Sequence, residues 1–541
     1  MIALLLLFSC DGPPVEAEPE GSLFVPLGSA RLARRISIDL RGQLPSREEL
    51  AIAAEAGGID TLTEQWLEDP AFEPHLAELL AEEWLLRLDT LRVDTSEFDL
   101  PTGDSYAFTR AFGDEPARLV AHVAALDRPF TDIVTTDVTM ANAMLLELAP
   151  LEAVDPTSTA PWQEARYTDG RPANGILSTS GLWLRYHTTI FNFNRGRASA
   201  LARLLLCYDF AARPVLFKDI ADESTEGLEA AITGEPGCVA CHAALDPLAG
   251  TLFGFWPVED LDGNELIGYF PERERLGEYY TGSAPAYWGT PVTAAAQLGP
   301  LVASDPRFPV CMARQAAERL LDRPTDEGDN LLVYDARDAL VAGWNYKDLL
   351  RHLLKTEEYR AGELSSAASE ADRERVHPLR RLSPNKLASV VEALTGYRWL
   401  YDHTDMLDGD LVGLRSLAGG ADGETVKKPY LDPSASRTLV VRRLAQAAAG
   451  TVVRDDLELD RESRRLVGTT VDDFTSIQPN SAAFDTEVEA LATAIFAEPL
   501  DDTEHAALRG LYRAVLVEGD SAEAWATVVS VMLRDPQFWT Y

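Results

Sequence analysis

Basic residues are scarce in this sequence, and long apolar runs are missing from it. Its 541 residues include 48 Lys and Arg against 87 Asp and Glu, which gives a formal net charge of −39. A surface this acidic disfavours nucleic acid and anionic lipid as partners and suits a basic protein better. No run of eighteen or more uncharged apolar residues occurs, so the sequence predicts no transmembrane helix.

Several common catalytic patterns are absent too. The sequence contains no Gly-rich phosphate loop, no H-E-x-x-H and no G-x-S-x-G. These patterns are typical of P-loop nucleotide-binding proteins, zinc metalloproteases and serine hydrolases. The chain is nevertheless globular in character, because 46% of its residues are apolar. Its length and composition predict roughly three or four domains with hydrophobic cores.

Cysteine and histidine are rare, with five and eight copies, yet three of these residues stand together. Residues 237–242 read G-C-V-A-C-H, the C-x-x-C-H order to which a c-type haem is covalently attached. We expect the thiols of Cys238 and Cys241 to add to the two haem vinyl groups, and His242 to bind the iron as proximal ligand. One haem c is the expected cofactor, because no second such motif occurs.

Two other interpretations of this stretch stay open. Cys238 and Cys241 could form a disulfide or a reduced dithiol beside an unrelated His242. They could also supply half of a zinc site, which needs a second pair of ligands. The other cysteines beyond the first ten residues are Cys207 and Cys311, and they stand singly and far from the motif. Haem attachment is therefore the favoured interpretation.

The second axial position on the iron is open in the sequence. Met312 and His187 are the candidate distal ligands, and an unoccupied position is the third possibility. Arg195 and Arg197 lie on the approach to the motif and could bond haem propionates through their guanidinium groups. Pairing of these arginines with nearby Asp or Glu is the alternative.

Cys207 and Cys311 are expected to form a disulfide, since unassigned cysteines tend to pair in an oxidising compartment. The bridge would enclose the haem segment in a loop of about a hundred residues, which the chain-entropy treatment values at about 4 to 5 kcal/mol. Two separate buried thiols are the alternative.

The first ten residues are apolar and end in Leu7-Phe8-Ser9-Cys10. This ending resembles the lipobox of bacterial lipoproteins, in which the cysteine is lipidated. The acidic, Pro-rich stretch that follows is typical of a tether. We therefore expect an exported protein in the periplasm or cell envelope, attached to a membrane through a lipid on Cys10.

Helical signals dominate the rest, so the expected fold class is mainly α and multi-domain, with a cytochrome c-like haem segment in the middle of the chain. Ser46 with Glu49, and Ser383 before Pro384, are helix-start signals. The stretches 317–359 and 494–538 echo one another and indicate a duplicated helical module. The expected divisions are a signal segment over 1–10, a tether over 11–28, an N-terminal helical domain over 29–150, a haem-bearing domain with a C-terminal helical module over 151–361, a linker over 362–372 and a C-terminal helical domain over 373–541.

Several short motifs occur in a characteristic order along the chain. They are Arg34-Arg35…Asp39-Leu40-Arg41-Gly42…Leu44-Pro45, Arg128-Pro129-Phe130…Asp137, Gly175-Ile176-Leu177-Ser178, Asn194-Arg195-Gly196-Arg197…Leu205-Leu206-Cys207, Cys238–His242 with Leu245-Asp246-Pro247, and Phe308…Cys311. Together they resemble the planctomycete-type cytochrome c family of large exported bacterial proteins. The resemblance implies a haem and an exported location, but no known reaction.

The sequence therefore predicts an exported single-haem c-type cytochrome lipoprotein that transfers electrons to or from a redox partner, which could be basic. One alternative is a haem enzyme whose sixth coordination position is open. Another is a haem-free structural or binding lipoprotein with a Cys238–Cys241 disulfide. An electron carrier is favoured over a catalyst.

Overall fold

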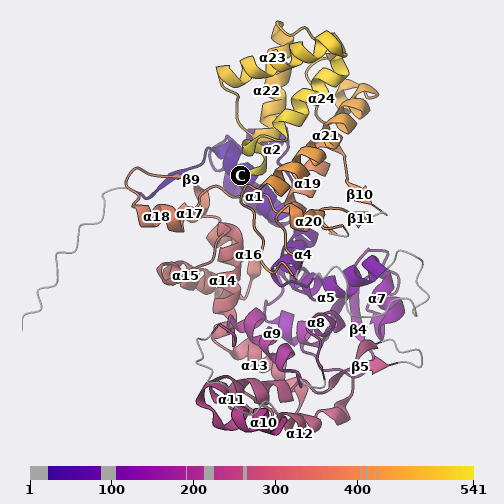
Figure 1. The fold of residues 1–541 in the computed structure, drawn as a ribbon, viewed down its shortest axis with the longest axis vertical. Coiled ribbons are helices and arrows are strands. Elements are labelled where there is room, and N and C mark those ends of the chain that lie inside the picture. Colours follow the sequence, from indigo (N-terminus) through magenta and orange to yellow (C-terminus); the bar gives the residue numbers. More distant parts are fainter. Residues whose placement is uncertain are drawn as a thin grey trace, which may run out of the picture.

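The computed structural model describes residues 22–86, 105–189, 192–212, 225–259, 265–401, 404–409, 412–422 and 425–541. Figure 1 shows an elongated body, with α22, α23 and α24 at one end and α10, α11 and α12 at the other. Helices dominate and the strands are short, so the expected mainly α class is confirmed. Within the described ranges, no helix combines the length and apolar character needed to cross a bilayer.

The helices up to the linker region form the larger part of the body. Their bounds are α1 Ser29–Arg41, α2 Arg47–Ala53, α3 Gly58–Leu67, α4 Phe72–Glu83, α5 Ser105–Ala125, α6 Asp132–Thr135, α7 Ala143–Leu148, α8 Ser180–Arg185, α9 Arg195–Leu206, α10 Thr225–Gly234, α11 Pro236–Gly250, α12 Leu276–Thr281, α13 Leu298–Ser304, α14 Arg307–Leu321, α15 Asn330–Gly343, α16 Tyr346–Leu353 and α17 Glu357–Arg360.

The remaining helices form the other end. Their bounds are α18 Glu370–Arg375, α19 Pro384–Thr395, α20 Leu414–Leu417, α21 Ala435–Leu457, α22 Ala482–Phe496, α23 Asp502–Glu518, α24 Ser521–Met532 and α25 Pro536–Trp539. Both helix-start signals are confirmed. Ser46 and Glu49 form a reciprocal capping box on α2, and the Ser383 side chain caps α19, whose first residue is Pro384.

The strands form small antiparallel sheets beside the helices. They are β1 Phe24–Pro26 with β9 Ala361–Leu364, the three-stranded sheet of β2 Thr139–Ala141, β4 Gln163–Tyr167 and β3 Leu151–Ala153, β5 Phe255–Glu259 with β6 Glu265–Tyr269, β7 Ala286–Tyr287 with β8 Thr290–Pro291, and β10 Leu400–Tyr401 with β11 Thr404–Asp405.

Two hydrophobic cores organise the body. The first contains buried apolar side chains from Leu32 to Tyr359. The second runs from Leu382 to Tyr541 and also includes Ile38. Because α1 contributes to both cores, this helix joins the two halves of the molecule.

The positions of cores and strands differ from the expected divisions in three places. The division at residue 150 falls inside one continuous core, since β3, which begins at Leu151, pairs with β4 beside β2. The end of the tether is ordered, because β1 pairs with β9 in register from Phe24 opposite Leu364. The expected linker over 362–372 contains most of β9 and the start of α18. Residues 1–21, with Cys10, lie outside the described residues.

The expected duplication corresponds to two four-helix runs, α14–α17 and α22–α25. Each run ends in a very short helix that buries one aromatic ring, Tyr359 in α17 and Phe538 in α25, both fully inaccessible to solvent. The preceding helices, α16 and α24, bury Tyr346 and Trp525, which lie at the same sequence distance before Tyr359 and Phe538. Trp344, which suggested the match to Trp525, instead ends α15 in a left-handed conformation, with φ +51°.

Candidate functional site

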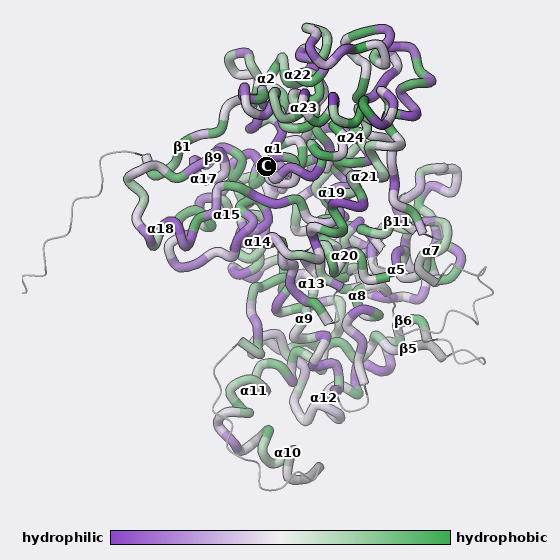
Figure 2. Tube along the Cα trace, turned by 45° about the horizontal axis from the view of Figure 1, so that its top comes forward, coloured by the Kyte–Doolittle hydropathy of each residue, from purple (hydrophilic) through white to green (hydrophobic). Residues whose placement is uncertain are grey.

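The C-x-x-C-H stretch lies in α11, at one end of the molecule. Pro236 occupies the first position of this helix, where its fixed φ suits the helical turn and its missing N–H is not needed. Cys238 and Cys241 are three residues apart, so their thiols lie one turn apart on the same side of the helix. Both are free, half-buried thiols. Figures 1 and 2 agree in placing α10 and α11 away from the second core.

His242 is bonded to a carboxylate one turn further along the same helix. Its Nδ1 lies 2.9 Å from Oδ1 of Asp246. An ionised carboxylate can only accept a hydrogen bond, so Nδ1 carries the proton and donates. Nε2 is then the ring nitrogen with a free lone pair, which is the form of imidazole that binds a metal. The His242 side chain is 24% exposed, so α11 does not bury the ring completely.

Asp246 is held in turn by Arg195, the first residue of α9. Arg195 Nε donates to Oδ1 over 2.6 Å, and Nη2 donates to Oδ2 over 3.0 Å. The Asp246 side chain is only 4% exposed. Burial alone would raise the pKa of this carboxyl, but the hydrogen bonds from His242 and Arg195 outweigh it and lower the pKa below its usual value. Asp246 is therefore ionised at neutral pH.

Arg197 has a different role from the one expected. It is fully buried, and it donates to the backbone oxygens of Phe255 over 2.6 Å and Tyr186 over 3.2 Å, and to Asn194 Oδ1 over 3.2 Å. Burial lowers its pKa to about 9. A guanidinium enclosed in this way offers no surface to a haem propionate, so Arg197 fixes the start of α9 against its neighbours. Arg195 pairs with Asp246, the alternative that the sequence left open.

The two candidate distal ligands lie in different surroundings. Met312 is only 3% exposed and packs within the first core on α14. Figures 1 and 2 separate α14 from α11. His187 is exposed on the segment between α8 and α9. The carbonyl of its neighbour Tyr186 accepts from Arg197 at the start of α9, the helix end that also grips Asp246. His187 therefore lies on a segment that is bonded to the start of α9.

Aromatic side chains lie on the Cys241 side of α11. Cys241 Sγ is 3.6 Å from the backbone oxygen of Phe210. The Phe210 ring lies 4.8 Å from Tyr208 and 6.4 Å from Trp288, centroid to centroid. The guanidinium of Arg307 lies 4.2 Å from the centre of the Trp288 ring. Sequence reasoning missed this cluster, because its members come from three distant segments with no shared spacing.

Cys207 and Cys311 form a disulfide that connects the end of α9 to α14. Their Cα atoms are 5.2 Å apart, and they are separated by 104 residues in the sequence. Gln315 Nε2 also lies 3.4 Å from the sulfur of Cys311. The bridge encloses α10 and α11, so the C-x-x-C-H stretch belongs to a covalently closed loop.

A zinc site is not formed by these residues. Among the described residues, no three or more His, Cys, Asp or Glu side chains gather in an arrangement that could hold a metal ion. The donor set on α11 instead fits a covalently attached haem. It offers two unpaired thiols and an adjacent imidazole whose Nε2 is left free by the bond to Asp246. On haem attachment, Cys238 and Cys241 would hold the porphyrin and His242 would bind its iron.

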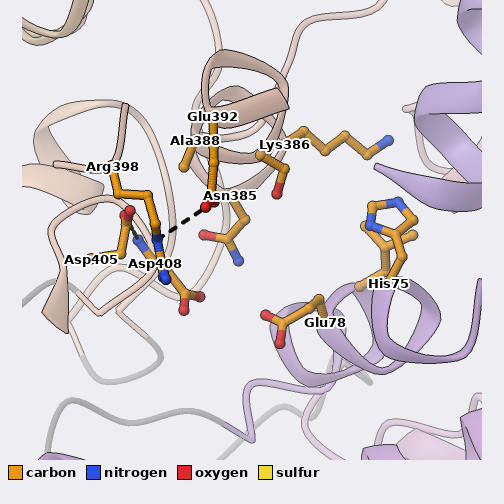
Figure 3. A pocket seen from close by; sticks show the side chains of 11 residues that line it. His75, Glu78, Asn385, Lys386, Ala388, Glu392, Arg398, Asp405 and Asp408 are labelled. Atoms are coloured by element: carbon orange, nitrogen blue, oxygen red, sulfur yellow. Dashed lines mark hydrogen bonds and ion pairs between the residues drawn. The ribbon is translucent and has the colours of Figure 1, made fainter. Parts of the chain in front are cut away.

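A small polar cavity of about 110 Å³ lies between α4 and α19, and Figure 3 shows the side chains that line it. It is lined by residues of α4, of α19 and of the segment around β10 and β11. They are His75, Glu78, Leu79, Asn385, Lys386, Ala388, Ser389, Glu392, Arg398, Asp405 and Asp408. Burial, helped by the nearby charge of Lys386, lowers the pKa of His75 to about 4. The Lys386 ammonium bonds Asp39 over 2.7 Å, so the cavity adjoins the buried polar contacts between the cores.

Comparisons with known proteins reach only the first part of the chain. Residues 27–148 match a family model described as PSD4, a protein of unknown function (DUF1592). This domain is found in planctomycete cytochrome c-like proteins. The matched segment runs from just before α1 to the end of α7 and does not include α11. No curated protein matches the chain, and neither does any solved structure.

Proposed function

We propose that this chain is an exported single-haem c-type cytochrome that transfers electrons and is attached to a membrane by a lipid on Cys10. The observation that carries the proposal is the donor set of α11: Cys238 and Cys241 as free thiols, and His242 with Nε2 available. The match of residues 27–148 to a domain of cytochrome c-like proteins supports it independently.

The place of α11 in the body also suits electron transfer. Electrons pass between proteins only over short distances, so a haem must approach the surface where the partner binds. Helices α10 and α11 lie at one end of the elongated body (Figure 2), and Cys238, Cys241 and His242 are all partly exposed. With a net charge of −39, the chain would attract a basic redox partner and repel nucleic acid.

Covalent haem is the first test. The full chain is produced in the periplasm of a bacterium that has the haem c attachment machinery, and is then denatured on a gel and stained for haem. We expect a stained band and an intact mass increased by one haem. Replacing both Cys238 and Cys241 by Ala should abolish the stain, because covalent haem needs the thiols.

A double variant of Cys207 and Cys311 to Ala is the matched control. It also removes two cysteines, but leaves α11 unchanged, so it should keep the stain. A wild-type chain with the mass of the bare polypeptide and no Soret absorption would contradict the proposal.

A haem enzyme with an open sixth position is a second candidate function. The observation that favours it is the position of Met312, which packs in the first core on α14, a helix that lies apart from α11 (Figures 1 and 2). One of the two protein ligands expected opposite His242 is then not beside the motif. Addition of carbon monoxide to the reduced protein separates the two functions. A prompt shift of the Soret band indicates an open position, whereas an unchanged spectrum indicates a six-coordinate haem. A His187→Ala variant that gains the shift would identify His187 as the distal ligand.

A further inference from the structure

We infer that Asp246, clamped by Arg195, is a positioning residue that sets the orientation and donor strength of the His242 imidazole toward the haem iron. This inference rests on the proposed haem. It goes beyond that proposal because it assigns control of the reduction potential to two residues outside the C-x-x-C-H motif.

The first step is geometric. His242 and Asp246 are four residues apart on α11, so their side chains lie on the same face one turn apart. The bond between Nδ1 and Oδ1, at 2.9 Å, fixes both the rotation of the ring and the position of its proton. Nε2 is thereby directed away from the carboxylate and has its lone pair available to a metal.

The second step concerns charge. A neutral backbone carbonyl could also accept from Nδ1, but Asp246 is an anion, and a charged acceptor forms a stronger hydrogen bond. It draws the Nδ1 proton toward itself, so the ring becomes more electron-rich and Nε2 a better donor. Ferric iron gains more than ferrous iron from a stronger donor. The Asp246 carboxylate should therefore stabilise the oxidised haem and lower its reduction potential.

The third step explains Arg195. An unpaired carboxylate with 4% exposure would be costly to bury. The bidentate guanidinium of Arg195 offsets that cost and keeps Asp246 ionised, because it donates to both oxygens over 2.6 and 3.0 Å. Arg195 begins α9, and the segment with His187 ends just before it, so the clamp also ties the His242 face of α11 to another segment of the protein.

The test compares Asp246→Asn and Asp246→Ala with the wild-type chain. Asn keeps the shape and a neutral acceptor oxygen, whereas Ala removes the acceptor. We expect the ferric-to-ferrous equilibrium to shift toward the ferrous form by about tenfold in the Asn variant, which corresponds to about 59 mV for a one-electron couple. The shift should be at least as large in the Ala variant. Spectroelectrochemical titration measures it.

Asp329→Asn is the matched control. Asp329 is another buried carboxylate, with 5% side-chain exposure, and Arg323 donates to its two oxygens over 2.7 and 2.8 Å. Among the described residues, the donors to Asp329 are Arg323, Arg375 and the backbone N–H of Asp326, and none of them is a histidine. This variant should lose stability but keep the wild-type reduction potential. A shift of equal size in both variants would overturn the inference, since it would report general destabilisation.

A second measurement does not need the haem. The full chain with Cys238 and Cys241 replaced by Ala is labelled with ¹⁵N-histidine, and the His242 signals are assigned by comparison with a His242→Gln variant. We expect the Nδ1-protonated tautomer, and a mixture of tautomers after Asp246→Ala. A wild-type His242 protonated mainly on Nε2 would overturn the inference.

The outcomes for the two proposals are distinguishable. Absence of haem from the wild-type chain contradicts the proposed cytochrome and leaves the tautomer measurement to decide on Asp246. A haem-loaded wild-type chain whose reduction potential does not change in either Asp246 variant contradicts the positioning role alone.

Discussion

Arg34 and Arg35 are consecutive residues of α1, and each donates hydrogen bonds to the end of a different helical run. Arg34 donates to the backbone oxygens of Phe538 and Thr540 over 2.7 and 3.0 Å. Arg35 donates to those of Tyr359 and Ala361, both over 2.7 Å. Each pair of carbonyls belongs to the last short helix of its run and to a residue just after it. The same contact is thus made twice from one helix, in agreement with a duplicated module.

Arg35 should be essential for stability. It is fully buried, and it also donates to the carbonyls of Pro378 and Tyr541. Arg35→Met would leave these carbonyls without their charged donor, and one unsatisfied buried group costs about 1 to 3 kcal/mol. We expect a loss of at least about 3 kcal/mol in the free energy of unfolding, measured by urea denaturation.

Arg47→Met is the control for this change. Arg47 donates to Thr469 in an exposed position, so its loss should change the free energy of unfolding by no more than about 0.5 kcal/mol. Equal effects of the two substitutions would contradict the role assigned to Arg35.

The Cys207–Cys311 bridge should contribute strongly to stability. Replacing both residues by Ala frees a loop whose ends are 104 residues apart. The chain-entropy treatment predicts a loss of about 4 to 5 kcal/mol. Urea denaturation with and without dithiothreitol measures the effect. Reductant should lower the wild-type midpoint and leave that of the variant unchanged; labelling of Cys207 or Cys311 by a thiol reagent in the unreduced, denatured chain would show that the bridge is missing.

His75 should make the protein less stable in mild acid. Burial lowers its folded-state pKa to about 4, whereas an unfolded histidine titrates near 6.5. Above pH 6.5 both states are neutral, so the stability is complete. As the pH falls from 6.5 toward 4, only the unfolded state gains the proton, and stability is lost. The expected loss between pH 7.5 and pH 5 is about 2 kcal/mol.

A His75→Gln variant should lack this part of the pH dependence, measured as the difference in unfolding free energy between the two pH values. His377→Gln is the control, because His377 is exposed and its removal should leave the profile unchanged. A wild-type profile identical to that of His75→Gln would show that His75 does not stay neutral in the folded protein.

Local signals in the sequence were sufficient for much of the fold. The capping box at Ser46 and the Ser383-Pro384 helix start were predicted correctly, because a cap depends on residues within one turn. The continuity of the first core across residue 150 could not be predicted in this way. Whether two helical stretches share a core depends on contacts between distant residues, and a polar loop between them occurs in either case.

In the candidate site, too, contacts that are local in sequence could be predicted and contacts between distant residues could not. The C-x-x-C-H order and the disulfide partners could be identified from residue type and spacing. The bond from His242 to Asp246 also had a sequence signal, since the two are four residues apart on a predicted helix. The hydrogen bonds from Arg195 to Asp246 had no sequence signal, because 51 residues separate these two residues. The same is true of Arg34 and Arg35, whose partners lie more than three hundred residues away.

The pairing of β1 with β9 fixes the place on the folded body where the proposed lipid anchor would attach. These strands lie at the side of the body, between the end that contains α11 and the end that contains α22 (Figure 1). An anchor upstream of Phe24 would therefore be attached at the side of the body, between its two ends. The end that contains α11 and the end that contains α22 would then lie on either side of the proposed attachment point.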